Sequence, residues 1–173
     1  MTVRKVIIHP DQRLKKICDP VEIIDDEIIE LGKDLLETMY KYSGIGLAAS
    51  QIGVMKRVFV MDCSTKEEKN SPFIFINPEI IWISEELNLH EEGCLSIPEI
   101  FVEIERPEKV EIKYTDEKGK KNSVIFDGIS ATCAQHEIDH LNGKLSIDYL
   151  GPIKRKLVVN KMKKAKKIKK LNG

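Results

Sequence analysis

Two histidines and a glutamate in this sequence have the spacing of a metal-binding helix. Residues 135–140 read Gln-His-Glu-Ile-Asp-His and contain the pattern His-Glu-x-x-His. Side chains four residues apart stand one above the other on a helix, so His136 and His140 can bind one metal ion. Glu137 can then act as a general base on a bound water. The alternative is a helix that buries both imidazoles and leaves Glu137 in solvent, but with four histidines in 173 residues the pattern is rarely accidental.

A metal site needs at least a third protein ligand, and the sequence limits where it lies. No histidine follows His140, and Asp148 is the only acidic residue downstream. The third ligand is therefore expected upstream, where Cys94 in His-Glu-Glu-Gly-Cys-Leu-Ser is the best candidate. A divalent cation would deprotonate this thiol, and Gly93 lets the backbone approach closely. Taken alone, such a cysteine is more often an inert buried thiol.

A third segment, residues 44–51, combines small residues with an amide. It reads Gly-Ile-Gly-Leu-Ala-Ala-Ser-Gln, and its glycines and alanines leave an open strip of main chain. An extended peptide can add to such a strip as an edge strand. The side chain of Gln51 supplies an amide donor suited to stabilising an oxyanion. A helix end followed by a tight turn explains the glycines equally well but says nothing about Gln51.

The segments 44–51, 92–96 and 135–140, in this order and at these separations, resemble the three signature motifs of the peptide deformylases. The similarity extends over residues 3–160. The resemblance implies a hydrolase that removes the N-formyl group from the N-terminal formyl-methionine of nascent polypeptides and releases formate.

The same resemblance implies a metal centre. Cys94, His136 and His140 would bind one Fe(II) ion per chain, which Zn, Ni or Co can replace, and a metal-bound hydroxide would attack the formyl carbon. Glu137 would take the proton from the water and hand it to the leaving amine. Glu92 is a candidate partner for a histidine N–H, which would fix the ring tautomer.

Further residues are implied to contact the substrate. The side chain of Gln51 and the backbone N–H of Leu95 would stabilise negative charge on the formyl oxygen. Main-chain groups of Ile45, Gly46 and Gly93 would hydrogen-bond the substrate as an added strand.

The methionine pocket is expected to be more polar than is usual in the family. Thr132 and Cys133 lie four and three residues before His136, so they face the metal side of the helix and are expected to bind substrate. Members of the family usually carry aliphatic residues where Thr132 and His90 stand. We therefore expect a less strict preference for methionine, with His90 at the pocket edge rather than on the metal.

Three helices are predicted around these motifs. Residues 26–42 place apolar side chains at helical spacing after Asp25 as N-cap. The residues between the N-cap Asp127 and the stop at 142–143 form a second helix of about four turns. A third begins with Pro152 and carries a narrow apolar stripe on a basic rod.

Short strands are predicted between the helices. Residues 57–61, 73–77 and 79–83 are rich in β-branched and aromatic residues, and Pro78 is expected to separate the last two. Alternation over 110–126 on both sides of a turn predicts a hairpin. The expected fold class is α+β, with short antiparallel strands and hairpins packed around the central His-Glu-x-x-His helix and a C-terminal helix.

The charge is divided unevenly along the chain. The totals balance at 28 basic and 28 acidic residues. Ten basic residues and no acidic one follow Asp148, so residues 1–148 hold 28 − 10 = 18 basic residues against 28 acidic ones. We expect a catalytic domain over residues 1–150, with 151–173 forming a basic helix and tail of the same domain.

The basic tail predicts a polyanionic partner. The family resemblance implies that residues 152–170 dock on the ribosome, without sequence-specific nucleic-acid recognition. A solvated lysine-rich helix explains the same charge run equally well. No apolar stretch approaches the roughly 18 residues that span a bilayer. We therefore expect a cytoplasmic protein with no membrane partner.

Two other functions remain open from the residues. A zinc metallopeptidase would share the His-Glu-x-x-His pattern, but it should not depend on Cys94 and should cut internal peptide bonds. An RNA-binding accessory with a degenerate site would keep its function after loss of Glu137.

Overall fold

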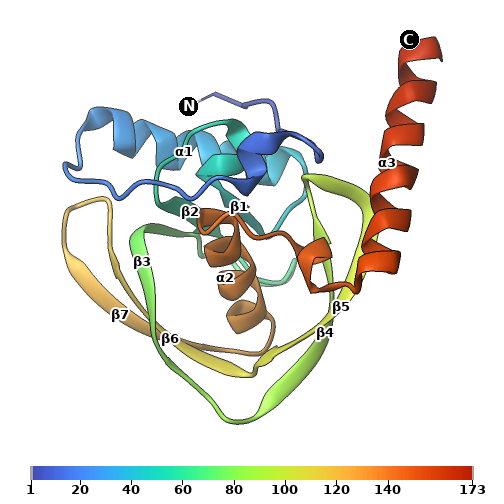
Figure 1. The fold of residues 1–173 in the computed structure, drawn as a ribbon. Coiled ribbons are helices and arrows are strands. Elements are labelled where there is room, and N and C mark those ends of the chain that lie inside the picture. The colour runs from blue at the N-terminus through green and yellow to red at the C-terminus, as the bar shows by residue number, and fades with distance from the viewer. Residues whose placement is uncertain (1, 173) are drawn as a thin grey trace.

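The fold is α+β and is described by a computed structural model for residues 2–172, with side chains for residues 2–168 (Figure 1). The helices are α1 (Asp26–Lys41), α2 (Gly128–Leu141) and α3 (Pro152–Asn172), with short 3-10 helices at Gln12–Lys15, Ala49–Ile52 and Ser146–Tyr149. The strands are β1 (Gly46–Ala48), β2 (Val58–Met61), β3 (Phe73–Ile83), β4 (Leu87–Cys94), β5 (Ile97–Pro107), β6 (Lys109–Thr115) and β7 (Lys121–Asp127).

The strands form two antiparallel sheets that meet around α2. The larger sheet has the order β1-β2-β3-β6-β7, and β4 pairs with β5 in a separate hairpin. In Figure 1, α2 lies at the centre, with β3, β6 and β7 curving around one side and the β4–β5 hairpin on the other. The predicted fold class, with a central motif-bearing helix, is confirmed.

The first helix follows the predicted pattern closely. The side chain of Asp25 accepts a hydrogen bond from the Ile28 N–H and so caps the helix, as expected. Leu31, Leu35 and Met39 on one face are buried against the larger sheet and the segment that follows β1. This packing fixes the start of the small-residue segment that contains β1.

The sequence predicted that Pro78 separates two strands, 73–77 and 79–83. This prediction is wrong, because β3 runs through Pro78 as one strand. Its pairing with β6 shifts between Ile76 and Glu79, which accommodates a residue without a backbone donor. Asn77 in this irregularity has a left-handed backbone with φ of 50°. Its side chain hydrogen-bonds both main-chain groups of Val21, each at 2.8 Å.

The β4–β5 hairpin was not predicted, although β4 ends at the candidate ligand Cys94. On β5, Val102, Ile104 and Arg106 are buried and alternate with exposed neighbours. The hairpin brings its inner face against α2, so Glu92 and Cys94 of β4 face the histidines of that helix.

The central helix has the predicted bounds. Asp127 occupies the N-cap position, but its side chain makes no capping hydrogen bond. At the other end Gly143 has φ of 74°, a conformation that favours glycine after a helix. The helix is buried along most of its length, which holds its polar side chains at fixed positions.

The C-terminal helix begins at Pro152, as predicted, and its first half packs against the body. Val158, Val159 and Met162 contact a core cluster that includes Leu145 and Ile147. The predicted apolar stripe does not continue as a packed face, because Ala165 and Ile168 are exposed. Figure 1 shows α3 rising along the side of the molecule to the C-terminus.

Among the described helices, α3 included, none combines the length and the apolar character needed to cross a bilayer.

Candidate metal centre and active site

Three potential metal ligands converge where β4 meets α2. The Sγ atom of Cys94 lies 3.3 Å from Nε2 of His140, which lies 3.2 Å from Nε2 of His136. The three donor atoms all lie within 4.8 Å of one another. One thiolate and two imidazoles at such separations suit a single borderline or soft divalent cation, so this donor set fits the metal expected from the sequence.

The two imidazoles are held in different environments. Burial lowers the pKa of His136, but hydrogen bonds with Cys94 and Glu92 outweigh it and raise the pKa well above its ordinary value. Burial and the neighbouring charge of His136 lower the pKa of His140 well below that value. Because the two rings are in contact, His136 and His140 cannot both be protonated without strong repulsion. At least one of them is therefore favoured in the neutral form that can bind a metal.

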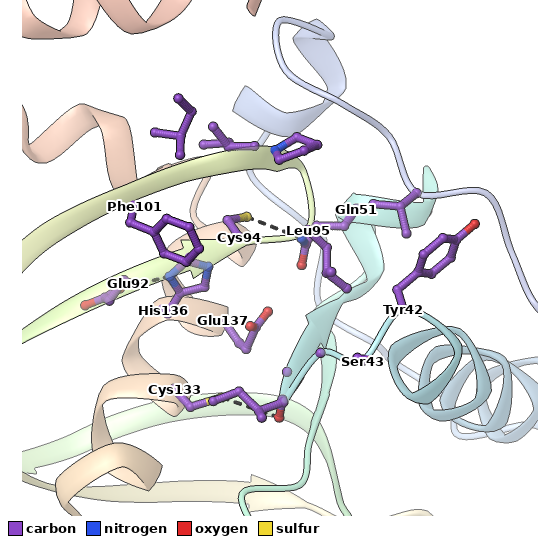
Figure 2. A pocket seen from close by; sticks show the side chains of 18 of the residues that line it. Tyr42, Ser43, Gln51, Glu92, Cys94, Leu95, Phe101, Cys133, His136 and Glu137 are labelled. Atoms are coloured by element: carbon purple, nitrogen blue, oxygen red, sulfur yellow. Dashed lines mark hydrogen bonds and ion pairs between the residues drawn. The ribbon is translucent and has the colours of Figure 1, made fainter.

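A buried carboxylate orients the first histidine. Oε1 of Glu92 lies 2.9 Å from Nδ1 of His136 (Figure 2). This contact leaves Nε2 of His136 to face His140. Burial raises the pKa of Glu92, but hydrogen bonds from His136 and Arg106 outweigh it, and the net shift is downward. A charged acceptor at Nδ1 fixes the ring tautomer and orientation, as it does in many metal sites.

Arg106 anchors that carboxylate and extends the network. Its Nε and Nη2 donate to the two oxygens of Glu92 at 2.6 and 2.9 Å. Its Nη1 donates to Asp139 at 2.9 Å and to the Tyr149 hydroxyl at 3.1 Å. The Tyr149 hydroxyl itself donates to Asp139 at 2.7 Å. A guanidinium that donates to both oxygens of Glu92 and is itself held by Asp139 and Tyr149 keeps Glu92 in one geometry.

This network was missed in the sequence, although one signal was present. Arg106 follows Val102 and Ile104 at the two-residue period of a strand, so it shares their inward face. A buried arginine requires an anionic partner. The pattern therefore predicts a carboxylate opposite Arg106, but not that both Glu92 and Asp139 supply one.

Glu137 is a buried carboxylate at the pocket wall. Its Oε2 atom has no hydrogen-bond partner within the described residues. Burial, reinforced by the charge of Glu92, raises the pKa of Glu137 to about 7. Gly46 of β1 makes room for it, because a Cβ there would lie 2.5 Å from Oε1 of Glu137 and 2.8 Å from Sγ of Cys133. The glycine therefore permits β1 to pass directly over the carboxylate.

The amide of Gln51 is fixed at both ends. Its Oε1 accepts from the backbone N–H of Ala48 at 2.9 Å. Its Nε2 donates to Oγ of Ser96 at 3.1 Å and lies 3.6 Å from Sγ of Cys94. These contacts turn the amide donor towards Cys94, one of the three candidate metal ligands (Figure 2).

The N-terminal segment joins the two motifs that carry Gln51 and Cys94. The Ile7 N–H donates to the backbone carbonyl of Gln51 at 2.7 Å, and the His9 N–H donates to that of Ser96 at 2.9 Å. Residues 7–9 thus bridge segments more than forty positions apart.

A cavity of about 740 Å³ opens beside these groups. Its lining contains every predicted site residue except the deeper His140: Ile45, Gly46, Gln51, Glu92, Gly93, Cys94, Leu95, Thr132, Cys133, His136 and Glu137. β1 is the edge strand of its sheet, since it pairs only with β2 among the described strands. The cavity therefore has both a closed end at the metal ligands and an open strand at its side.

The expectation for His90 is wrong, because His90 does not line this cavity. Its Nε2 atom is buried without a hydrogen-bond partner in the described structure. Phe101, which the sequence patterns did not single out, does line it and is 65% exposed. The Phe101 ring lies over Gly93, where a Cβ would come within 2.9 Å of it.

A cysteine, two helical histidines and a buried glutamate on an α+β fold define a metal-dependent hydrolase. Residues 3–156 match the family model described as "Polypeptide deformylase". The chain belongs to this family, and it is an enzyme that removes the N-formyl group from nascent peptides. The metallopeptidase alternative is not supported.

Relatives cover nearly the whole chain. The peptide deformylases of Bartonella henselae and Rhizobium meliloti are each 50% identical over 167 residues, covering 96% of this chain and 95% and 96% of their own lengths. The structure resembles that of peptide deformylase from Ehrlichia chaffeensis in complex with actinonin, at 40% identity and a TM-score of 0.91, covering 95% and 98% of the two chains. A peptide deformylase structure from Legionella pneumophila gives 42% identity and a TM-score of 0.89, covering 97% and 98%.

Proposed function

We propose that Cys94, His136 and His140 hold a ferrous ion, beside which Glu137 carries out the proton transfers of deformylation. The observation that supports this most directly is the convergence of three donor atoms within 4.8 Å next to a carboxylate oxygen without a partner. When bound, the cation would supply Lewis acidity, which makes a water nucleophilic near neutral pH and stabilises developing negative charge.

The choice of iron follows from the donor set and the family resemblance. A thiolate is a soft donor, and a Cys-His-His set accepts Fe(II) as well as Zn, Ni or Co. Cys94 is half-buried rather than enclosed, so oxidants can reach the ligand sulfur. We therefore expect the iron form to be sensitive to oxygen and peroxide.

Glu137 moves the proton. Its free oxygen lies at the cavity wall, where it can accept a proton from the water that adds to the formyl carbon. The same carboxyl then delivers that proton to the amine nitrogen as the C–N bond breaks. Formate and a free N-terminal amine are the products. Burial beneath β1 keeps this carboxyl at the reacting atoms.

Gln51 and Leu95 stabilise the oxygen of the formyl group as it becomes negative. The amide of Gln51 is already oriented by Ala48 and Ser96, so no reorganisation is needed when charge develops. The backbone N–H of Leu95, next to the ligand Cys94, is the second donor.

The peptide lies along the free edge of β1. Main-chain groups of Ile45 and Gly46 on one side and Gly93 on the other hydrogen-bond it as an added strand. The methionine side chain enters beside Thr132 and Cys133. The hydroxyl of Thr132 makes this wall more polar than an aliphatic residue would, which favours a less strict preference for methionine.

Anaerobic reconstitution tests this assignment. The chain loaded with Fe(II) should release one formate per molecule of a formyl-Met tripeptide, and Cys94→Ser should lower the bound metal measured by elemental analysis. Glu137→Gln should retain the metal but lose turnover. Formate release no greater than that of Glu137→Gln would contradict the proposed mechanism, whereas cleavage of internal peptide bonds would indicate a peptidase.

The basic segment 152–170 is proposed to bring this enzyme to ribosomes in the cytoplasm. The described side chains of α3 are mostly exposed, so their positive charges are available to ribosomal RNA phosphates. Co-sedimentation with ribosomes at low salt should be lost when residues after Leu150 are deleted. Unchanged co-sedimentation would refute the docking while leaving the catalytic assignment intact.

The division into parts follows the same contacts. Residues 1–150 would form the catalytic domain, and 151–173 would be a helix and tail of that domain rather than a separate unit. Packing of Val158 and Met162 against the core supports this arrangement.

A further inference from the structure

Two cysteines outside the metal set lie together behind the methionine pocket. Cys133 on α2 is buried, and Cys63 follows β2 and packs against the same core cluster. Their side chains hydrogen-bond to each other, and Cys63 also hydrogen-bonds the side chain of Ser130, one turn before Cys133 on α2. The two thiols are therefore held in direct contact by a strand end and a helix.

The two sulfurs face different cavities. Cys133 lines the substrate cavity, where its Sγ lies 3.6 Å from the backbone carbonyl oxygen of Ile45 (Figure 2). Cys63 lines a second cavity of about 380 Å³, together with Ser64, Ser71 and Ser130. A small polar oxidant can thus reach Cys63 from the second cavity without entering the active site.

We propose that Cys63 and Cys133 form a peroxide-sensitive dithiol, whose oxidation to a disulfide reshapes the methionine pocket. The part concerning the pocket rests on the proposed function, and the part concerning bond formation does not. Hydrogen peroxide is the oxidant. Disulfides in cytoplasmic proteins are uncommon and typically transient, as a reversible switch requires.

The chemistry takes place in two balanced steps. The Cys63 thiolate attacks one oxygen of hydrogen peroxide, giving a Cys63 sulfenic acid and hydroxide. The Cys133 thiol then attacks the sulfenic sulfur, forming the S–S bond and releasing water. Two electrons pass from the thiols to peroxide.

The environment assigns Cys63 the first step. The hydrogen bond from Cys133 lowers the pKa of Cys63 and outweighs the opposing effect of burial, with Ser130 assisting. The contact with Cys63 and burial raise the pKa of Cys133. The more acidic and less buried thiol therefore reacts with the oxidant, and its neighbour resolves the product.

Disulfide formation changes the substrate side of the pair. It removes the thiol hydrogen of Cys133, which can then no longer be donated to Cys63 or to the Ile45 carbonyl, and it draws the Cys133 sulfur towards Cys63. That sulfur lies against Gly46, so the packing around the proposed substrate-binding residues Ile45 and Gly46 changes. The disulfide does not modify Glu137 or the proposed metal ligands. We therefore expect a higher KM for formyl-Met peptides with a smaller change in kcat.

Peptide mapping of zinc-loaded protein tests bond formation independently of activity. After treatment with hydrogen peroxide and alkylation, the peptides containing Cys63 and Cys133 should be joined, with a loss of two hydrogens that dithiothreitol restores. Cys18, buried in the same core cluster, is the internal control and should stay reduced. Recovery of Cys63 only as a sulfinic acid, or only in dimers linked between chains, would overturn the proposal.

Kinetics with a matched variant test the effect on the pocket. Cys63→Ser keeps the size of the side chain and a hydrogen bond but cannot form the disulfide, so its untreated activity should equal that of the wild type. Peroxide damage to Cys94 affects both proteins equally. The wild type alone should show an additional rise in KM that dithiothreitol reverses. A mapped disulfide with no such difference would overturn the role in the pocket, and inactivity of both untreated proteins would instead contradict the proposed function.

Discussion

The helices α2 and α3 make opposite use of polar side chains. In α2, ten of fourteen residues are buried, among them both histidines and Glu137. In α3, no described side chain is buried, and Ile153 and Leu157 are even 79% and 65% exposed. The imidazole of His136 is buried beside the opposite charges of Glu92 and its partner Arg106, whereas Glu137 is buried with one oxygen unpartnered. Apart from Arg155, which lies 3.9 Å from Asp148, the described charges of α3 have no such structural requirement and are available to a partner.

The sharpest test of this difference replaces one oxygen atom of the Glu137 carboxylate in α2 by an amide nitrogen. Glu137→Gln preserves size but removes the proton acceptor, so kcat/KM should fall by about 10²–10⁴-fold while the protein stays folded. Lys161→Gln, an equally small change on α3, should leave kcat/KM unchanged. Formate-release kinetics and circular dichroism measure both. Equal effects of the two substitutions would remove the proposed contrast.

A second test removes the counter-charge of the α2 site. Arg106→Ala leaves Glu92 and Asp139 without their shared cation, so the free energy of unfolding should fall by about 3–5 kcal/mol. Metal affinity should also fall by roughly 10–100-fold, because His136 loses its fixed orientation.

The matched control for Arg106 is Arg13, whose pair with Asp11 is exposed. Arg13→Ala should leave the free energy of unfolding almost unchanged, because solvent screens this pair. Urea unfolding and metal titration distinguish the two positions. Similar losses for both would show that the buried network does not support the site.

A third test concerns how α3 is held. Asp148 accepts from the Leu145 N–H and pairs with Lys15, and Arg155 of α3 lies 3.9 Å away. Burial raises the pKa of Asp148, but these contacts outweigh it and hold the pKa below 3.8. A lowered folded pKa contributes stability above the unfolded value, and that stability is lost as the pH falls through the folded pKa.

Asp148→Asn should therefore be less stable than the wild type at pH 7. The difference in unfolding free energy should shrink below about pH 3.8 and vanish in stronger acid. Thermal unfolding across this pH range measures it. A difference that is constant with pH would assign the effect to altered packing rather than charge.

The smallest effect on catalysis is expected at the outer half of α3. Replacing Lys163, Lys164 and Lys167 by glutamine should leave kcat/KM unchanged. It should weaken ribosome binding, and the negative slope of log affinity against log salt should become shallower by about 0.7–0.9 for each phosphate that is no longer neutralised. An unchanged slope would mean that these lysines are only solvated.

The sequence was most informative where local rules apply. Asp25, Pro152 and the turn before β7 mark element boundaries through capping, fixed φ and turn chemistry, and the structure agrees there. Pro78 was misleading, since a shift in strand register tolerates it. His90 was placed at the pocket edge because the family usually carries an aliphatic residue there, but a position matched in the chain does not specify whether a different side chain reaches the cavity.

The rest depended on contacts between distant segments. No local pattern predicts that Arg106 of β5 bridges Glu92 and Asp139, because that requires knowing how β4 and β5 pair and pack on α2. The three motifs pointed to a common site through their complementary chemistry and through their resemblance, in order and separation, to the peptide deformylase motifs. Long-range geometry decides the supporting residues, whereas residue type decides the candidates for chemistry.

The hydrogen bonds from Ile7 and His9 have a consequence for inactivation by heat. They tie the first residues of the chain to the segments that carry Gln51 and Cys94. Residues 7–9 lie outside the helices and strands, and such segments open at a lower free-energy cost than the packed core. The proposed oxyanion donors Gln51 and Leu95 should therefore lose this support while the core around α2 is still folded. We expect catalysis to end at a lower temperature than cooperative melting.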